Sequence, residues 1–509
     1  MLAKVATATL IGADALPIEV EVDVGLGLPG FTVVGLPDAS VQEAKERVRT
    51  ALRNGGFYVP ARKVVVNLAP ADIRKEGTGF DLPIAIGLAL ATEQIKPCET
   101  PFWAIGELAL DGNLRPVPGV LSVALAARVA GILHLIVPAA NAAEAALVVG
   151  LQVHPAHDIG EALRIAADPA NAITECHDPA ALLRPPDLNL PDFADIKGQD
   201  LAKRALAIAA AGGHNLIMVG PPGSGKTMLA RRLPSILPNL EFKEALEVMK
   251  LYSVSGHLAA GRGLITVRPF RSPHHTVSNA GLIGGGSHGP KPGEVSLAHH
   301  GVLFLDELLE FKREMLELLR QPLEDRVITV SRIAGSVTYP AKFMLIASMN
   351  PCPCGHQHDP LKACVCSPGQ IERYWNKLSG PLLDRIDIHL MVPRLRQDEL
   401  LSAPNGEDSA TLRARVVIAR QRQQARFADT ETSCNADMSP SQLRTYCPLD
   451  DASQELLRRA IQHLKLSGRA YDRILKLART IADIEVADAV QAAHIGEAIQ
   501  YRMLDRPRT

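Results

Sequence analysis

The chain has 509 residues, of which 47% are hydrophobic, 21% charged and 4% aromatic, and its formal net charge is −1. This length allows about three domains with separate cores, and no apolar run approaches the roughly 20 residues that span a bilayer. The charge excludes a uniformly basic surface but allows a local basic ring, and the absence of a signal-peptide core or a disulfide framework among the eight cysteines predicts a cytoplasmic protein.

Residues 1–180 alternate strand-like and helix-like segments, which predicts an α/β domain. Residues 18–24 alternate apolar and acidic side chains, as a half-buried strand does, and 63–67 and 131–138 are further predicted strands. Residues 41–54 and 82–91 are predicted helices. No catalytic cluster is evident in this part of the sequence.

Residues 75–140 resemble the proteolytic domain of Lon proteases and its inactive relatives in DNA-processing ATPases. The resemblance is carried by Ile105-Gly-Glu-Leu-Ala-Leu-Asp-Gly-Asn-Leu-Arg-Pro-Val-Pro-Gly119. The Lon serine would fall in 76–81, which contains no serine, and its lysine partner would fall near Leu121. Thr78 could serve as a nucleophile, but no lysine stands in the expected place, so we expect an inactive scaffold or a DNA-contacting tier.

The prolines of residues 181–195 disfavour regular structure and predict a linker between domains. The following Ile196-Lys-Gly-Gln199 is similar to the turn that AAA+ ATPases place beside the adenine.

The segment 220–227 has the sequence GPPGSGKT and fits the phosphate-loop pattern G-x-x-x-x-G-K-[ST] after an apolar strand. Glycines let successive backbone N–H groups point at a polyphosphate, and the following helix directs its positive N-terminal end at the same anion. Lys226 is expected to reach the β- and γ-phosphates and Thr227 to bind Mg²⁺. The predicted ATP-binding residues are Gly220, Pro221, Pro222, Gly223, Ser224, Gly225, Lys226 and Thr227, together with Asp306.

The segment 301–307, GVLFLDE, has the form of a buried strand that ends in two acids. Asp306 is expected to hold Mg²⁺ through water, and Glu307 to polarise the attacking water. This pair predicts hydrolysis rather than phosphate transfer to another substrate.

Residues 250–296 form a long Gly- and His-rich segment between the two nucleotide motifs. Such an insertion in a compact ATPase is more often functional than decorative, and it resembles the segment that supplies pore loops in helix-2-insert AAA+ proteins. Residues 326–340 are predicted to form a β-hairpin. The candidate DNA contacts are Arg268, Arg271, His274, His275, Lys291 and Arg332, and the alternative is that they are solvated loop residues.

Three further polar positions match AAA+ elements. Asn350 follows a predicted strand and resembles the sensor-1 residue that orients the lytic water. Arg385, in GPLLDRIDI, resembles an arginine finger that reaches the γ-phosphate of a neighbouring subunit. The alternative is a surface arginine paired with Asp384 or Asp387. Arg469 is the predicted sensor-2 arginine, with Arg473 as the second choice.

The cysteine cluster consists of two C-x-C pairs. Four thiolates could hold a tetrahedral Zn²⁺, although C-x-C is tighter than the usual C-x-x-C spacing. His356 and His358 are alternative ligands, and free structural thiols are the other interpretation. The predicted zinc ligands are Cys352, Cys354, Cys364 and Cys366.

The whole chain resembles the ComM/YifB family of magnesium-chelatase-like AAA+ ATPases, through RSPHH at 271–275, MNPCPCG at 349–355, PLLDRID at 381–387 and YDRIL at 471–475. The resemblance implies a homohexameric ring that encircles single-stranded or branched DNA and uses ATP and Mg²⁺ for branch migration during natural transformation, with recombination proteins as partners. A magnesium chelatase motor subunit and a non-enzymatic nucleotide-binding scaffold are the alternatives.

The expected fold is α/β in three parts. A Lon-like (ribosomal protein S5 domain 2-like) domain spans 1–180 and a linker 181–195. An AAA+ αβα core with a helix-2 insert and a pre-sensor-1 hairpin spans 196–395. A second linker spans 396–410, and a small helical lid domain spans 411–509.

Overall fold

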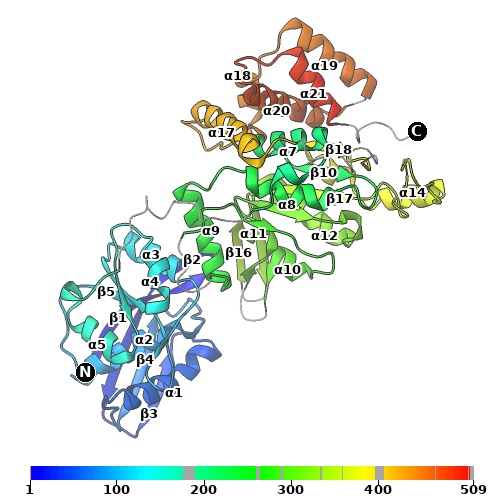
Figure 1. Cartoon of the computed structure of the whole chain (residues 1–509). Helices are drawn as coiled ribbons and strands as arrows, with labels where there is room; N and C mark the ends of the chain where they lie inside the picture. The colour runs from blue at the N-terminus through cyan, green and yellow to red at the C-terminus, as the bar shows by residue number, and fades with distance from the viewer. Residues whose placement is uncertain are drawn as a thin grey trace.

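The computed structural model describes residues 2–175, 190–258, 264–286, 290–332, 335–357, 359–395, 406–464, 466–502 and 504. Most of both predicted linkers, His358 and the side chain of Arg332 lie outside the described residues. Figure 1 shows the N-terminal sheet at one end of the molecule, a second sheet in the middle and the C-terminal helices at the other end. Within the described ranges, no helix is long and apolar enough to cross a membrane.

The N-terminal region is built on a seven-stranded mixed sheet with the order β3-β4-β2-β1-β5-β8-β9. The long strands β1 and β2 pair antiparallel, whereas β5, β8 and β9 run parallel to β1. The strands are β1 (Leu2–Ile11), β2 (Asp14–Gly25), β3 (Gly30–Val34), β4 (Lys63–Ala69), β5 (Phe102–Ala104), β8 (His134–Pro138) and β9 (Gln152–Ala156), and β6 (Glu107–Leu108) pairs with β7 (Leu114–Arg115) outside this sheet.

Helices of this region cover the sheet and confirm the predicted segments. The helices are α1 (Ala39–Asn54), α2 (Asp81–Ala91), α3 (Val120–Val129), α4 (Ala139–Ala145) and α5 (Ile159–Ala167). The helix predicted over 82–91 is buried almost all round, in agreement with its uniformly apolar sequence. The strands predicted over 18–24, 63–67 and 131–138 correspond to β2, β4 and β8.

The central region is built on a five-stranded parallel sheet with the order β11-β14-β17-β10-β18. Its strands are β10 (Leu216–Val219), β11 (Phe270–Arg271), β14 (Val302–Leu305), β17 (Met344–Met349) and β18 (Ile388–Met391). The associated helices are α7 (Asp200–Gly212), α8 (Lys226–Ile236), α9 (Phe242–Ser255), α10 (Asn279–Ile283), α11 (Glu294–Leu297), α12 (Arg313–Leu318), α13 (Arg320–Asp325), α14 (Pro368–Trp375) and α15 (Gly380–Leu383).

Both faces of the central sheet are buried, which explains why its strands are apolar at successive positions. Leu216 and Met218 of β10 lie in one core with α7 and α8, whereas Ile217 and Val219 lie in a second core on the opposite face. The sheet is therefore a rigid platform, and its strand ends fix the side chains that come directly after them.

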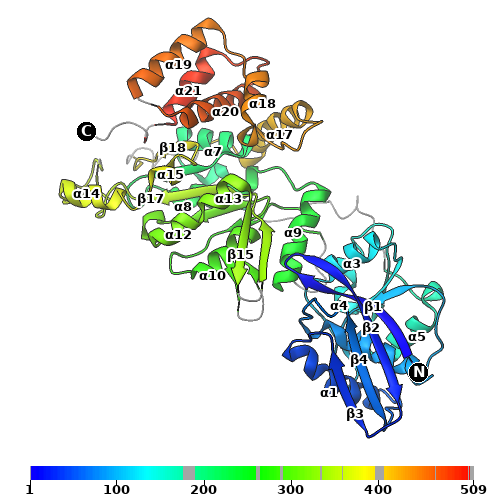
Figure 2. The same cartoon turned by 180° about the vertical axis from the view of Figure 1, so that it is seen from behind.

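The predicted hairpin over 326–340 is confirmed as β15 (Val327–Arg332) and β16 (Gly335–Pro340). A shorter pair, β12 (Gly284–Gly285) and β13 (Lys291–Pro292), lies against it, because a Cβ on Gly284 would come within 3.1 Å of Val330. Figure 2 shows the longer hairpin on the side of the central sheet that faces the N-terminal region.

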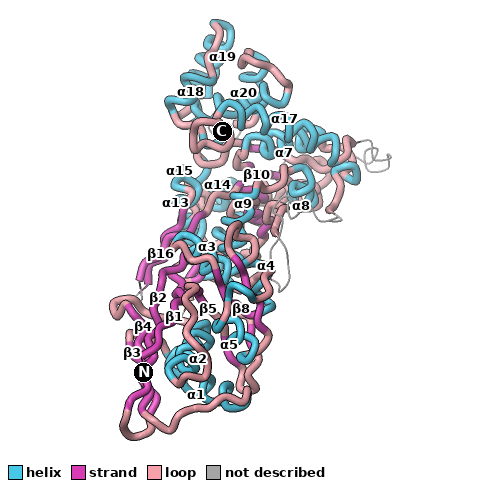
Figure 3. Tube along the Cα trace, turned by 90° about the vertical axis from the view of Figure 1, so that its left-hand side faces the viewer, coloured by secondary structure: helices cyan, strands magenta, loops and turns pink. Residues whose placement is uncertain are grey.

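Within the described part of the chain, five α-helices follow residue 405 and gather at the end of the molecule opposite the N-terminal sheet, as Figure 3 shows. They are α17 (Ser409–Arg426), α18 (Pro440–Tyr446), α19 (Asp451–Leu464), α20 (Gly468–Ile484) and α21 (Ala492–Gln500). These helices share one core with α7 and the central sheet. Phe193, predicted within a linker, is fully buried in this core, because the linker's C-terminal end packs beside α17.

Helix α9 joins the N-terminal and central regions. Its apolar residues lie in one core with Val120, Leu121 and Ala124 of α3. The backbone N–H of Gly119 donates to Oγ of Ser253 at 3.0 Å, and that hydroxyl donates to Oε2 of Glu144 at 2.7 Å. The N-terminal region is therefore packed onto the helix that follows the phosphate-loop helix in the chain.

Candidate nucleotide site

The predicted phosphate loop connects β10 to α8, as its sequence indicates. Gly220 is required by close packing, because a Cβ there would lie 2.2 Å from the carbonyl oxygen of Val392. Gly225 has a φ of +90°, which lies in the left-handed region that glycine tolerates, and it precedes the first residue of α8. The loop thus places the N-terminal end of an 11-residue helix beside the site.

Lys226 lies folded over the phosphate loop. Its Nζ donates to the carbonyl oxygens of Gly220 at 2.7 Å and Pro221 at 2.9 Å, and lies 3.5 Å from Oδ1 of Asn350. Burial lowers the pKa of Lys226, while the carboxylates of Asp306 and Glu307 oppose this shift. The ammonium group is therefore held where the loop would receive a phosphate, by carbonyl partners that an anion can replace.

Asp306 joins the end of β14 to the phosphate-loop helix. Oγ1 of Thr227 donates to Oδ2 of Asp306 at 2.7 Å, and the hydroxyl of Ser348 at the end of β17 bonds to the other carboxylate oxygen. Hydroxyl and carboxylate oxygens are the ligands that Mg²⁺ prefers, so these groups fit that ion. Sequence reasoning missed Ser348; its signal was its position one residue before the end of a strand adjacent to β14.

Glu307 adopts a left-handed backbone conformation with a φ of +51°, and its N–H donates to Oδ1 of Asp306 at 3.0 Å. Its side chain is 58% exposed and lies 3.7 Å from Nδ1 of His275. A positive φ at a residue other than glycine is sparsely populated and is maintained only by surrounding structure. His275, predicted as a DNA contact, thus lies beside the acidic pair.

Arg385 lies at the edge of the sheet formed by the amino ends of its parallel strands, here called the amino edge, whereas Lys226 lies at the edge formed by their carboxyl ends. It precedes β18, and its backbone carbonyl accepts a hydrogen bond from Nδ2 of Asn215, which precedes the parallel strand β10. Strands of four residues separate these edges by about 13 Å. The Arg385 side chain is paired with Glu324 of α13, not with the neighbouring aspartates that the sequence suggested.

The two arginines considered for sensor 2 also lie toward this amino edge. Arg473 is paired with Asp387, which directly precedes β18. The hydrogen bond from Arg385 lowers the pKa of Glu324, and the positive charges of Arg385 and of the exposed Arg469 add to this shift. The structure therefore groups Arg469 with Arg385 and not with Lys226.

The predicted DNA contacts divide into partly buried, ion-paired arginines and exposed residues. Arg268 is held by Glu244 at 2.8 Å and by two carbonyl oxygens, and Arg271 is paired with Glu294 at 2.6 Å. These guanidinium groups stabilise the fold of the inserted segment. His274 and Lys291 are exposed, and Lys291 begins β13 beside the longer hairpin.

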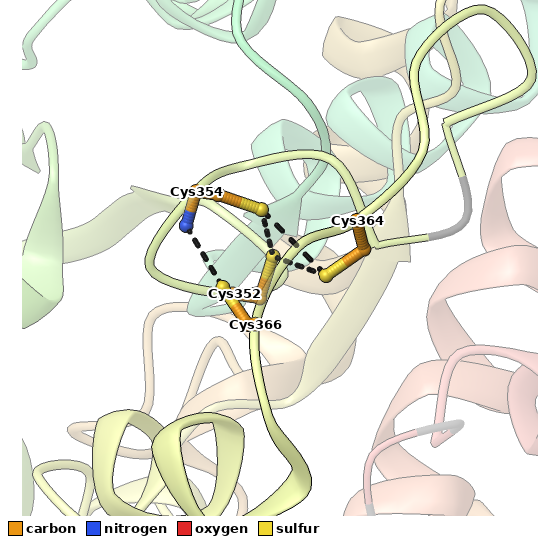
Figure 4. A group of neighbouring side chains, drawn as sticks. All are labelled: Cys352, Cys354, Cys364 and Cys366. Carbon is orange, nitrogen blue, oxygen red and sulfur yellow. Dashed lines mark hydrogen bonds between the residues drawn. The ribbon is translucent and has the colours of Figure 1, made fainter.

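The four predicted cysteines lie together, with their sulfur atoms turned toward one another (Figure 4). Cys352, Cys354 and Cys364 have Sγ–Sγ distances of 3.4 to 3.6 Å, and all four sulfur atoms lie within 4.8 Å of one another. His356 bonds instead to Asp359 at 3.1 Å. Among the described residues, four thiols at one point on a loop form the group best suited to a soft metal ion.

The predicted Lon-like segment does not assemble a serine–lysine pair. The hydroxyl of Thr78 donates to Glu107, and Leu121, where the lysine would fall, is fully buried in an apolar core. Nearby, Arg47 donates to both oxygens of the buried Asp81, at 2.6 and 2.8 Å. Thr78 thus bonds to a carboxylate and Arg47 to Asp81, while an apolar side chain takes the place of the catalytic lysine.

Family models of magnesium chelatase match three stretches of the chain. The model of magnesium chelatase subunit ChlI matches residues 192–400, the model described as subunit ChlI of Mg-chelatase matches 20–141, and the C-terminal model of the same subunit matches 406–502. The fold and the site therefore define an α/β phosphate-loop protein of the magnesium chelatase type.

Two relatives match over almost the whole chain. Protein YifB of Salmonella typhimurium is 45% identical over 515 residues, and competence protein ComM of Haemophilus influenzae is 43% identical over 509 residues; both comparisons cover 99% of this chain and 98% of the relative. Lon protease 2 of Bacillus subtilis is 34% identical over 143 residues, or 27% of this chain and 26% of the protease. The chain belongs to the ComM/YifB family of magnesium-chelatase-like AAA+ proteins.

Proposed function

We propose that this protein is an ATP-dependent, homohexameric AAA+ translocase that promotes branch migration and helps to integrate incoming single-stranded DNA during natural transformation and homologous recombination. The competence name of the Haemophilus influenzae relative, at 43% identity, supports the biological setting. ATP and Mg²⁺ are the cofactors, single-stranded and branched DNA the substrates, and recombination proteins the proposed partners.

One observation carries the ATPase part of the proposal. Lys226, Asp306 and Asn350 follow three adjacent parallel strands and meet at one edge of the central sheet. In this arrangement Lys226 binds phosphate, and Thr227 and Asp306 provide oxygen ligands for a divalent ion. Glu307 accepts a proton from the attacking water. Asn350 orients that water, because its amide oxygen faces Lys226 across the site.

The position of Arg385 supports assembly into a ring. Arg385 and Arg469 lie toward the amino edge of the sheet, so they serve a nucleotide held by an adjacent subunit and not the nucleotide of their own chain. Exchange of the Glu324 partner for a γ-phosphate would release Arg385 for that role. A closed ring supplies every nucleotide site with one such neighbour, and six subunits are the number that we propose.

The two paired hairpins support a DNA-binding role. Lys291 on β13 and Arg332 at the end of β15 belong to hairpins that pack against each other, and His274 is exposed on the same inserted segment. Phosphate contacts need exposed cations on elements that can move with the nucleotide state. We propose Lys291, Arg332 and His274 as the DNA-contacting residues.

The decisive experiment measures ATP hydrolysis with and without single-stranded and four-way-junction DNA, together with migration of the labelled junction. We expect DNA to stimulate hydrolysis and ATP to move the junction. Lys291→Ala combined with Arg332→Ala should leave basal hydrolysis intact and reduce the salt slope of DNA binding by about 1.5, since each phosphate contact contributes roughly 0.7 to 0.9.

Arg458→Ala combined with Arg459→Ala is a control with the same loss of charge, because these side chains are exposed on α19. It should leave the salt slope unchanged. Wild-type protein that hydrolyses ATP but neither binds DNA nor moves the junction would contradict the translocase. Stimulation of hydrolysis by a tetrapyrrole would then support a chelatase motor, which the family models favour as the second candidate.

A further inference from the structure

The spacing of the four cysteine sulfur atoms matches one tetrahedral ion. Zinc–thiolate bonds of about 2.3 Å place the sulfur atoms of a tetrahedron about 3.8 Å apart. Cys352, Cys354 and Cys364 have Sγ–Sγ distances of 3.4 to 3.6 Å. A cluster of several iron atoms would hold some of its cysteine sulfurs much further apart than the 4.8 Å limit of this group, so the spacing favours a single ion.

A backbone donor orients one of the four sulfur atoms. The N–H of Cys354 donates to Sγ of Cys366 at 3.4 Å. Donors of this kind orient the ligands of a metal and stabilise their negative charge. Two C-x-C arms from loops thus present their sulfur atoms to a common point (Figure 4).

We propose that Cys352, Cys354, Cys364 and Cys366 bind one Zn²⁺, and that this structural metal fixes the loop that positions Asn350 in the nucleotide site. Zinc suits a closed set of four thiolates and needs no redox partner. The metal binding stands on the cysteine geometry alone, whereas the effect on hydrolysis also depends on the ATPase function proposed above.

Chain continuity and close packing connect the cysteine loop to the nucleotide site. Asn350 stands two residues before Cys352, and the intervening Pro351 carbonyl accepts a hydrogen bond from Nε1 of Trp375 at 2.9 Å. Gly355 packs so closely on Pro222 of the phosphate loop that a Cβ would lie 2.7 Å from its ring.

Arg394 closes the connection from the other side. Its Nη2 donates to the carbonyl of Pro222 at 3.2 Å and to Oδ2 of Asp359 at 3.1 Å, and Asp359 belongs to the segment between the two cysteine pairs. Loss of the metal would free both ends of this segment. Asn350 and Pro222 would then lose their fixed positions beside the nucleotide site. The rest of the phosphate loop would remain in place, because it is anchored by β10 and α8.

The first test measures zinc in full-length protein purified under reducing conditions. We expect about one zinc per chain, and almost none in Cys354→Ser combined with Cys364→Ser, since a site that loses two of four ligands binds far more weakly. Cys98→Ser is the control, because Cys98 lies in the N-terminal region, and its zinc content should equal that of the wild type.

Cobalt replacement identifies the ligands. Co²⁺ in the wild-type protein should give the sulfur-to-cobalt charge-transfer bands and intense d–d bands of a tetrahedral four-thiolate site. A wild type with no more zinc than the double variant, or with a weak octahedral cobalt spectrum, would overturn the metal site. Disulfides detected among the four cysteines under the same reducing conditions would do so as well.

The second test removes zinc from the wild-type protein with a chelator and restores it, which avoids dependence on the folding of a variant. We expect kcat for ATP to fall about tenfold and to recover with Zn²⁺, with a smaller change in nucleotide Kd, because Asn350 acts on water and Lys226 on phosphate. Equal kcat in both forms would exclude the positioning role. A zinc-loaded protein without any ATP hydrolysis would contradict the proposed function and leave the zinc measurement decisive for the metal site.

Discussion

The molecule contains two α/β sheets that differ in the residues at the carboxyl ends of their strands. In the central sheet, three adjacent parallel strands lead into the phosphate loop, Asp306 and Asn350, and these groups meet. In the N-terminal sheet, the parallel strands β5 and β8 lead into Ile105 and Ala139, and a polar residue, His157, follows the edge strand β9. Layered α/β architecture alone therefore does not make a site; the polar residues at neighbouring strand ends do.

Polar groups in the N-terminal sheet serve the fold instead. Arg47 neutralises the buried Asp81, and Glu144 ties the region to α9. The difference between the sheets predicts that substitutions in the central sheet change catalysis, whereas those in the N-terminal sheet change stability.

The largest effect is expected at the phosphate loop. Lys226→Ala should abolish detectable ATP binding, because it removes the charge that faces the phosphates. Glu307→Gln should preserve ATP affinity and lower kcat by about 10²-fold to 10⁴-fold, because the Glu307 carboxylate acts on the attacking water and not on the phosphates. Isothermal titration and steady-state hydrolysis separate the two variants, and an equal loss of affinity in both would contradict these roles.

Arg385→Ala should lower kcat by about 10³-fold without loss of ATP affinity in its own subunit. Mixing Arg385→Ala with Lys226→Ala subunits should restore part of the hydrolysis, since some interfaces then combine an intact phosphate loop with an intact arginine. Absence of rescue in rings that native mass spectrometry shows to be mixed would argue against action between subunits.

Arg47→Met should destabilise the N-terminal region by about 3 kcal/mol at pH 8, because it leaves a buried carboxylate without its partner. Burial raises the pKa of Asp81 to about 6, against the ordinary 3.8, even though Arg47 lowers it. The folded protein therefore takes up a proton as the pH falls through about 6, and the stability lost by ionising Asp81 is regained between pH 6 and 3.8.

The penalty of Arg47→Met should shrink below pH 6, where a protonated Asp81 needs no cationic partner. Urea unfolding at pH 8 and pH 5 measures the difference. Arg53→Met, on the exposed end of the same helix, is the control and should show no such pH dependence. A penalty for Arg47→Met that is constant with pH would contradict the buried ion pair.

Local patterns were sufficient to predict the strands, the phosphate loop and the acidic strand end, because each depends on neighbouring residues in the chain. The partners of Arg268, Arg271 and Arg385 could not be predicted, since Glu244, Glu294 and Glu324 approach them only through tertiary packing. A basic residue in a glycine-rich segment resembles a free cation until its carboxylate is located.

The cysteine pairs show the intermediate case. The sequence shows two separate C-x-C pairs but does not show that they meet. The loop after β17 brings the two pairs together. Likewise, the sequence placed Arg469 in the final helices, and only the shared core of those helices with α7 determines that it lies near Glu324.

The smallest effect is expected for Thr78→Ala. Its hydroxyl donates to Glu107 at a partly exposed position, so its loss should cost at most about 1 kcal/mol in urea unfolding. ATP hydrolysis and DNA binding should not change, because Thr78 belongs to the N-terminal sheet region and bonds to none of the nucleotide-site groups. Wild type and variant should both fail to cleave a fluorogenic protein substrate, since the buried Leu121 occupies the place of a catalytic lysine. Cleavage by the wild type that disappears in Thr78→Ala and persists in Thr78→Ser would show that the N-terminal sheet carries chemistry of its own and would end the distinction between the two sheets.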